Sequence, residues 1–314
     1  MKLLGLEEDL RRRSSRPTTG KLIIGVLGEY LYRPGIQTAH TNIGNLTRLR
    51  ESRMERAKQG EDAEEMRKHV EPIWTGQIVY RSLITREALE SVFPGHPSLS
   101  YPIQGRIINA AALISKPECY GSVYDGPWVA QVAQEDLKAE FVNWESRVQT
   151  LLDLMKSPSK WVINSVDSLP SFVSGRVALI GDAAHAMTPH QASGAGQAVE
   201  DGFVLASLLA QPEVNRITVT EALKTYDEVR RPFAQDILQR SLRTGEIYFL
   251  QCPRVQDVTL ESSAAGGISE NTLLELNDDL GDILRWTWTT SIVDDRERAI
   301  ALFKNRLGIN IAAV

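Results

Sequence analysis

The chain has 314 residues, of which 42% are hydrophobic and 24% are charged, and its formal net charge is −5. This length predicts one or two domains with a sizeable core, and the near-average composition argues against disorder for most of the chain. The modest negative charge excludes a basic nucleic-acid or membrane-surface binder, and the two isolated cysteines, with no signal peptide and no membrane span, favour a cytoplasmic protein.

Residues 1–69 form a first segment that is charged and uneven. Acidic and basic residues alternate densely over 48–69, a pattern typical of a solvated helix or a floppy insert; a functional arm is the less favoured interpretation. Residues 70–150 form a second segment. Its β-rich runs up to about residue 130 are separated by turn residues, which predicts an antiparallel sheet.

Residues 151–314 form a third segment, first α/β in pattern and then mostly helical. Val177–Ile180 is a short apolar run and predicts a buried parallel strand. Gly181 ends the run and allows a sharp turn. Asp182 would then lie at the carboxyl end of a strand, where open α/β sheets bind ligands.

Small residues follow Pro189 and precede an apolar-periodic run, which predicts a loop and a helix that starts between Gly194 and Gln197. Few side chains would obstruct a flat ligand there, and the helix start offers N–H groups with a partial positive charge. Farther on, Thr218 and Glu221 have the spacing of a capping box at the start of a long helix, which Pro232 is expected to kink.

Each candidate residue also has a plainer interpretation. Asp182 could be only a turn or cap residue, and Pro189 and Gln191 could be ordinary loop residues. His185 and His190 could bind a metal with Asp182, but their spacing is loose and no fourth ligand is near in sequence. We therefore predict no metal site and expect His185 to brace the turn.

Residues 176–202 resemble the second flavin-binding motif of the FAD-dependent aromatic hydroxylases, most closely the salicylate-hydroxylase-like branch. The resemblance implies that Asp182 binds the ribityl chain of FAD and that the following loop lies against the isoalloxazine ring. Ala192 stands where the family usually has glycine; if the position needs a positive φ, alanine costs about 1 kcal/mol there. The predicted cofactor-binding residues are Gly181, Asp182, Pro189, Gln191, Ala192, Ser193, Gly194, Ala195 and Gly196.

The resemblance extends from about residue 70 to the end of the chain and implies a substrate pocket to which Tyr80, Arg81 and Tyr101 could contribute. Tyrosines on strands are more often core residues, so this role is the minority interpretation. The family's opening Gly-x-Gly-x-x-Gly turn has no counterpart here, although Lys21–Arg33 could be a damaged copy of another family motif. We therefore expect weak FAD binding, from a chain that is truncated, misassigned at its start or truly divergent.

The fold class implied is α/β (α+β): an incomplete FAD-binding Rossmann-like domain, an antiparallel β-sheet substrate domain and C-terminal helices. The function implied is an FAD-dependent monooxygenase that uses NADH or NADPH and O2 to hydroxylate a small aromatic substrate. Two alternatives stay open. One is a non-catalytic remnant that acts as an interaction protein, and the other is a flavin oxidoreductase of the same fold, such as an epoxidase.

Overall fold

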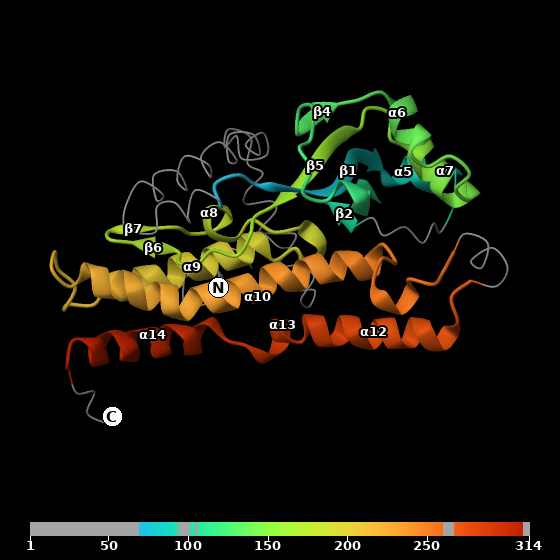
Figure 1. Cartoon of the computed structure of the whole chain (residues 1–314). Helices are drawn as coiled ribbons and strands as arrows, with labels where there is room; N and C mark the ends of the chain where they lie inside the picture. Colours follow the sequence, from blue (N-terminus) through green and yellow to red (C-terminus); the bar gives the residue numbers. More distant parts are fainter. Residues whose placement is uncertain (1–68, 93, 95–100, 104–105, 260–266, 310–314) are drawn as a thin grey trace. The chain divides into compact units, whose positions relative to one another are not determined.

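The structure is a computed structural model that describes residues 69–92, 94, 101–103, 106–259 and 267–309 (Figure 1). The chain divides into two compact units. Within the described residues, unit 1 comprises Val79–Ala112 and Pro127–Trp161, and unit 2 comprises 69–78, Leu113–Gly126 and 162–309. The predicted segment boundaries, after residues 69 and 150, stay a prediction. The charged segment before residue 69 and the motif copy proposed within it lie outside the described residues.

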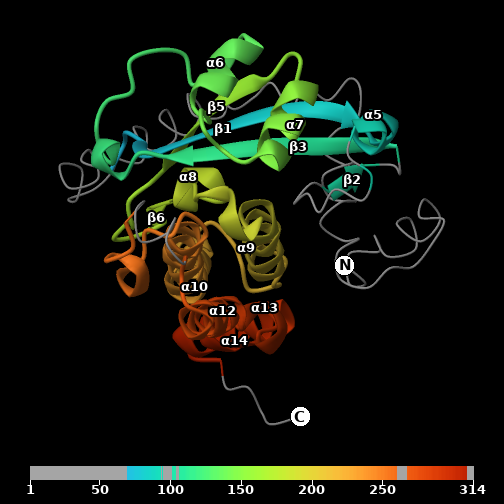
Figure 2. The same ribbon diagram turned by 90° about the vertical axis from the view of Figure 1, so that its right-hand side faces the viewer.

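A five-stranded sheet has the strand order β2-β3-β1-β5-β4 (Figure 2). Strand β2 pairs antiparallel with β3, and β4 pairs antiparallel with β5. These pairings confirm the antiparallel sheet predicted from the β-rich runs. The strands are β1 Ile73–Thr85, β2 Tyr101–Ile103, β3 Ile107–Ser115, β4 Val129–Gln131 and β5 Ser159–Ser165.

Unit 1 contains three short helices, each of which buries one leucine: α5 Arg86–Val92, α6 Gln134–Ala139 and α7 Ser146–Leu154. Helices α6 and α7 contact each other. Their buried residues Leu137 and Leu152 therefore anchor short, largely exposed helices to this unit.

Unit 2 is mainly helical, and its four long helices are α9 Gly194–Leu209, α10 Val219–Tyr248, α12 Glu270–Leu284 and α14 Ile292–Arg306. Helix α10 contacts α9, α12 and α14 (Figures 1 and 2). The shorter elements are 3-10 turns η2 Pro117–Cys119, η3 Pro189–Gln191 and η4 Pro253–Val255, strands β6 Val173–Ser174 and β7 Val177–Ala178, and helices α8 Asp182–His185 and α13 Trp286–Thr289.

The main core of unit 2 lies where α9, α10 and α14 pack against the β6–β7 hairpin. Phe172, Tyr226 and Phe303 are its largest apolar side chains, and all three are fully buried. The Tyr226 hydroxyl donates to the Leu179 carbonyl at 2.9 Å, so the one polar atom of this ring is satisfied. A second cluster fixes the end of α10 to α12 through Ile247 and Leu276.

The prediction of a buried parallel strand over Val177–Ile180 is wrong. Strand β7 covers only Val177–Ala178 and pairs antiparallel with β6, and Ile180 is 43% exposed. The reason is a two-residue hairpin turn that begins at Gly175, whose φ is +55°. An apolar run does not distinguish a hairpin arm from a parallel strand.

The predicted capping box at the start of α10 is also not formed. Thr218 directs its hydroxyl into the preceding loop, where it donates to the Glu213 carbonyl and accepts the Asn215 N–H. The long helix itself is confirmed, and it continues past Pro232 to Tyr248.

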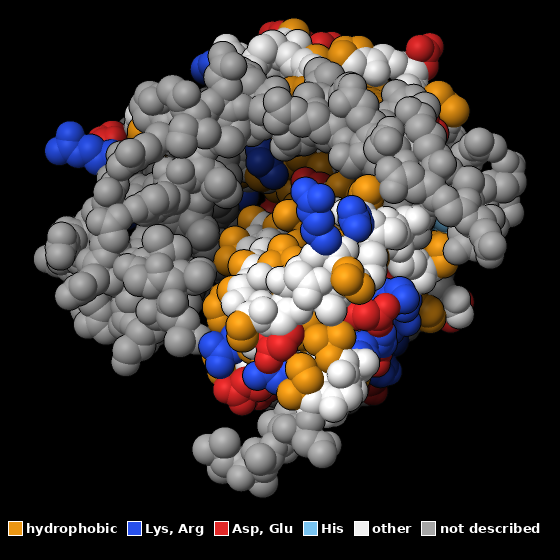
Figure 3. Space-filling model, turned by 90° about the vertical axis from the view of Figure 1, so that its left-hand side faces the viewer, with side chains coloured by type: hydrophobic (Ala, Val, Ile, Leu, Met, Phe, Trp, Pro, Cys, Tyr) orange, Lys and Arg blue, Asp and Glu red, His pale blue; other side chains and the backbone are white. Residues whose placement is uncertain are grey.

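Acidic and basic side chains are interspersed on the helices of unit 2 rather than separated by sign (Figure 3). Ion pairs within these helices include Lys224 with Glu221 and Arg298 with Asp295. No helix in the described ranges is long and apolar enough to cross a membrane.

Candidate functional site

The turn at Gly181 connects the β6–β7 hairpin to α8. Gly181 has φ +57°, and its carbonyl accepts the N–H groups of Ala184 and His185 at 2.8 and 2.9 Å. A Cβ atom at Gly181 would lie 3.0 Å from the Cβ atom of Ala198 on α9. Both the backbone angle and the close approach of α9 therefore require glycine here.

Asp182 is the first residue of α8, and its side chain is exposed. Desolvation by the surrounding protein raises the pKa of this carboxyl, and nearby His185 lowers it by a smaller amount. Helix α8 has no side-chain cap, so the cap interpretation of Asp182 receives no support. The carboxylate remains accessible to a ligand.

The loop after Pro189 forms the turn η3 and then reverses at Ala192, which is left-handed with φ +52° and ψ 28°. Helix α9 begins at Gly194, which confirms the predicted start. Alanine in this conformation costs about 1–2 kcal/mol, so the strain expected at position 192 is present. From Ala192 to Gly196 no side chain is larger than that of serine, and the N–H groups at the helix start are sterically accessible.

One face of α10 holds this loop in place. The Ser241 hydroxyl donates to the Thr188 carbonyl at 2.6 Å, and Gln191 Nε2 donates to Thr244 Oγ1 at 2.9 Å. A Cβ atom at Gly245 would lie 2.4 Å from the His190 ring, so the absence of a side chain lets the ring pack on the helix.

Two further contacts fix the same loop from outside α10. His190 Nε2 lies 2.8 Å from Gln77 Oε1, and Trp286 Nε1 donates to Gln191 Oε1 at 3.1 Å. Burial lowers the pKa of His190 to about 4. The imidazole is therefore neutral at pH 7, with its proton on Nε2 facing the Gln77 oxygen.

A buried ionic network lies behind the Gly181 turn. Asp201 Oδ2 accepts the Gly181 N–H at 2.9 Å and lies 2.6 Å from His185 Nε2. Asp201 Oδ1 accepts Arg230 Nε at 3.0 Å, and the side chains of Asp201, His185 and Arg230 are completely buried. Desolvation opposes the ionisation of Asp201, but the His185 hydrogen bond and the Arg230 charge dominate and lower its pKa.

The guanidinium of Arg230 has four acceptor residues and also lies 5.4 Å from the ring centroid of Phe233. Besides Asp201, it contacts Gln197 Oε1 at 2.7 Å, Glu200 Oε2 at 3.1 Å and Asp295 Oδ2 at 3.5 Å. A buried guanidinium needs such partners because an unpaired charge would be strongly destabilising. The network thereby joins α9, α10 and α14 to the turn that carries Asp182.

Comparison with known proteins supports the predicted resemblance. Residues 125–241 match a family model described as an FAD binding domain. A salicylate hydroxylase of Pseudomonas putida is 36% identical over 254 residues, which cover 73% of this chain and 55% of that protein. The 3-amino-4-hydroxybenzoate 2-monooxygenase PtnB3 of Streptomyces platensis is 32% identical over 190 residues, 57% of this chain and 46% of that protein.

Among solved structures, a salicylate hydroxylase substrate complex has a TM-score of 0.63 and 31% identity, covering 73% of this chain and 57% of that one. The chain is a relative of the FAD-dependent aromatic hydroxylases. It spans about half the length of the curated relatives that it matches. The matched segment 125–241 contains the Gly181 turn, the loop over Pro189–Gly196 and Arg230. These comparisons confirm the predicted fold class and FAD as the predicted cofactor.

The predicted substrate-pocket residues Tyr80, Arg81 and Tyr101 lie in unit 1. Tyr80 on β1 is 3% exposed, as expected of a core tyrosine. Arg81 is exposed and its guanidinium lies 5.6 Å from the ring centroid of Trp161. Tyr101 lies on β2, and its side chain lies outside what the structure describes. The substrate-binding role of all three stays a prediction.

The two histidines considered as metal ligands contact side chains of the same chain: His185 contacts Asp201, and His190 contacts Gln77. Within the described part of the chain, no group of three His, Cys, Asp or Glu side chains could hold a metal ion. His185 shares Asp201 Oδ2 with the Gly181 N–H, a contact that fits the predicted bracing role.

Asp201, Arg230 and Gln197 are the residues of this site that sequence reasoning missed. An acidic residue near a helix start is already favourable in the field of the helix dipole, so the position of Asp201 does not by itself predict a buried partner. A usable signal was present, because Gln197 and Asp201 are four residues apart and share a face with apolar Val204 and Leu208. Polar residues on an apolar helix face need buried partners.

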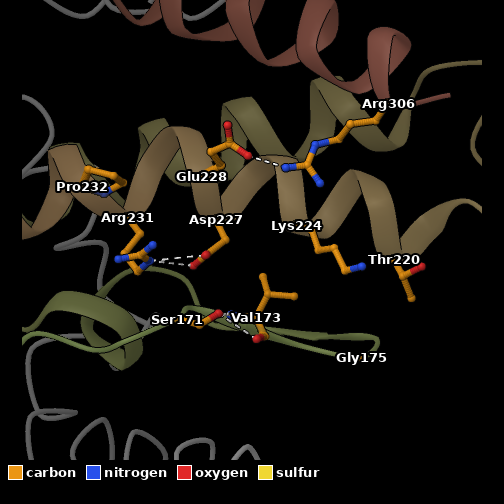
Figure 4. A pocket seen from close by; sticks show the side chains of 10 residues that line it. All are labelled: Ser171, Val173, Gly175, Thr220, Lys224, Asp227, Glu228, Arg231, Pro232 and Arg306. Carbon is orange, nitrogen blue, oxygen red and sulfur yellow. Dashed lines mark hydrogen bonds and ion pairs between the residues drawn. The ribbon is translucent and has the colours of Figure 1, made fainter. Parts of the chain in front are cut away.

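A separate open pocket of about 650 Å³ lies between the β6–β7 hairpin, α10 and the end of α14 (Figure 4). Its charged side chains are paired: Arg231 with Asp227, Arg306 with Glu228, and Lys224 with Glu221, which lies outside the lining. This pairing leaves no concentrated charge of either sign to attract an ionic ligand. Neither Asp182 nor the Pro189–Gly196 loop lines it.

Proposed function

We propose that this protein is an FAD-dependent monooxygenase that hydroxylates a small aromatic substrate with NADH or NADPH and O2. Two features of one segment carry the proposal. Asp182 is an exposed acidic residue on a glycine turn, and the helix that starts at Gly194 is preceded by residues with small side chains. Relatives named for salicylate and 3-amino-4-hydroxybenzoate favour a hydroxylated benzoate as the substrate class.

The residues present fit a flavin. The Asp182 carboxylate can accept a hydrogen bond from a ribityl hydroxyl, which is an uncharged polar donor. The left-handed Ala192 and the small residues after it allow a flat ring to approach the backbone of the loop. The N–H groups and partial positive charge at the start of α9 suit the ring edge that becomes negative on reduction.

Bound FAD would supply the redox chemistry, taking hydride from the nicotinamide and reacting with O2. The chain itself contributes position and charge. The anchors on α10 fix the loop through Ser241 and Thr244, so its backbone donors are preorganised before a ligand binds. No side chain is required as a covalent nucleophile, in agreement with the absence of a nucleophile motif from the sequence.

The proposal is tested by titrating the protein with FAD and comparing it with Asp182→Ala. Losing the acceptor of a partly desolvated hydroxyl costs about 1–3 kcal/mol, so we expect FAD affinity to fall by roughly 5- to 150-fold. Asp278→Ala, which removes an exposed carboxylate from α12, is the matched control and should leave affinity unchanged.

A second measurement addresses the reaction. Salicylate should accelerate NADH or NADPH oxidation by the FAD-loaded protein and yield a hydroxylated product, both of which decrease in Asp182→Ala. Flavin content is measured per folded protein, alongside the melting temperature. If Asp182→Ala melts earlier but keeps full FAD affinity, Asp182 is a turn residue and not a ligand-binding one.

A further inference from the structure

A buried carboxylate, that of Asp201, accepts hydrogen bonds from the Gly181 turn. The Gly181 N–H points to Asp201 Oδ2, which His185 Nε2 also approaches. Both donors belong to the short segment that carries Asp182: one precedes it and the other ends its helix, α8. A single carboxylate oxygen thus ties both ends of this segment to α9.

The acceptor is itself fixed in place. Its second oxygen binds Arg230 Nε, and Arg230 also contacts Gln197, Glu200 and Asp295. Because the Asp201 and Arg230 side chains are completely buried, neither can exchange its partners for water. Burying these charged side chains costs desolvation free energy. Apolar packing could join two helices equally well without that cost.

Among the described contacts, the Gly181 N–H donates to Asp201 alone. Glycine adopts its φ of +57° readily, but its backbone is also the least restricted of any residue, so contacts made by its N–H are needed to hold one conformation. Without Asp201, the Gly181 N–H would lose its acceptor and the Ile180–Gly181 peptide could rotate.

We infer that Asp201, held by Arg230, is a positioning residue that fixes the Ile180–Gly181 peptide, and with it the turn that carries Asp182, for FAD binding. The inference rests on the proposed function of Asp182 but concerns residues that need not touch the cofactor. Asp201 acts through the turn, and Arg230 acts through Asp201.

The test compares Asp201→Asn with Asp227→Asn. Asp227 is a matched control because its carboxylate also accepts a backbone N–H, that of Phe172 at 2.6 Å, and also pairs with an arginine, Arg231. It does not contact the turn. Hydrogen exchange of the Gly181 amide is measured by mass spectrometry at a temperature where both variants are folded, and FAD affinity is measured on the same samples.

We expect Gly181 exchange to be at least ten-fold faster in Asp201→Asn, with at least ten-fold weaker FAD binding, and neither change in Asp227→Asn. An unchanged exchange rate, an equal increase in both variants, or faster exchange with unchanged FAD affinity would each overturn the inference. If the unsubstituted protein binds no FAD, the proposed function fails, and the exchange comparison decides alone whether Asp201 fixes the turn.

Should Asp201→Asn not fold, Arg230→Lys provides the same test. Lysine keeps the positive charge beside Asp201 but cannot reproduce the contacts to Gln197 and Glu200. A smaller rise in Gly181 exchange, with a matching loss of FAD affinity, supports the inference. No rise in a folded Arg230→Lys protein contradicts it.

Discussion

Ala192→Gly should stabilise the protein, although glycine substitutions usually destabilise. Ala192 has φ +52° and is exposed, so its methyl group contributes strain and little packing. Relief of the left-handed conformation contributes about 1–2 kcal/mol. The greater conformational freedom of glycine in the unfolded chain offsets about 0.4–1 kcal/mol of this stabilisation. The two ranges leave a net gain of about 0–1.6 kcal/mol, with a midpoint of about 0.8 kcal/mol.

The assay is thermal unfolding, where this gain corresponds to a rise of about 2 °C in Tm. Ala206→Gly is the control, because Ala206 is also exposed but lies within α9 and has ordinary helical geometry. That substitution should lower stability by about 0.5–1 kcal/mol. Equal decreases in Tm for both variants would refute the reasoning, since they would show that position 192 carries no left-handed strain.

Two further predictions concern His190. Gly245→Ala would place a Cβ atom 2.4 Å from the His190 ring and should lower the free energy of unfolding by about 1–3 kcal/mol. Gly202→Ala, whose Cβ atom would meet nothing within 4 Å, should instead raise it by about 1 kcal/mol. Unfolding of both variants checks this. The pKa of His190 in the folded protein is about 4, below its ordinary 6.5. Neutral His190 therefore contributes up to about 3 kcal/mol to the free energy of unfolding above pH 6.5, and this contribution is lost as the pH falls toward 4. His190→Gln should flatten the stability profile over that window, and an unchanged profile would contradict the assignment.

The sequence predicted best where a local pattern decides the structure. The helix start at Gly194 follows from a few adjacent residues, whereas the positive φ at Ala192 was suggested only by the family's usual glycine at that position. It failed at Val177–Ile180 because a short apolar run fits several strand environments, and the hairpin partner depends on the turn at Gly175. The Thr218 capping box failed because the loop before it offered the hydroxyl a competing partner.

The buried network could not be predicted from sequence spacing. Asp201 and Arg230 are 29 positions apart, and Asp295 lies 65 positions beyond Arg230. Such pairings depend on the packing of α9, α10 and α14, which only tertiary structure determines. The presence of a polar residue on an apolar helix face predicts that a partner exists, but not which one.

Helix α10 connects the two halves of the candidate flavin site. Arg230 acts on the Gly181 turn through Asp201, while Ser241 and Gly245 hold the loop before α9. Arg230 and Ser241 are eleven residues apart, which is about three turns and about 16 Å along a helix, so they lie on nearly the same face. The relative position of Asp182 and the helix start is therefore set largely by one rigid element. A substitution that shifts α10 should disturb ribityl and ring contacts together, whereas Asp182→Ala should disturb only the first.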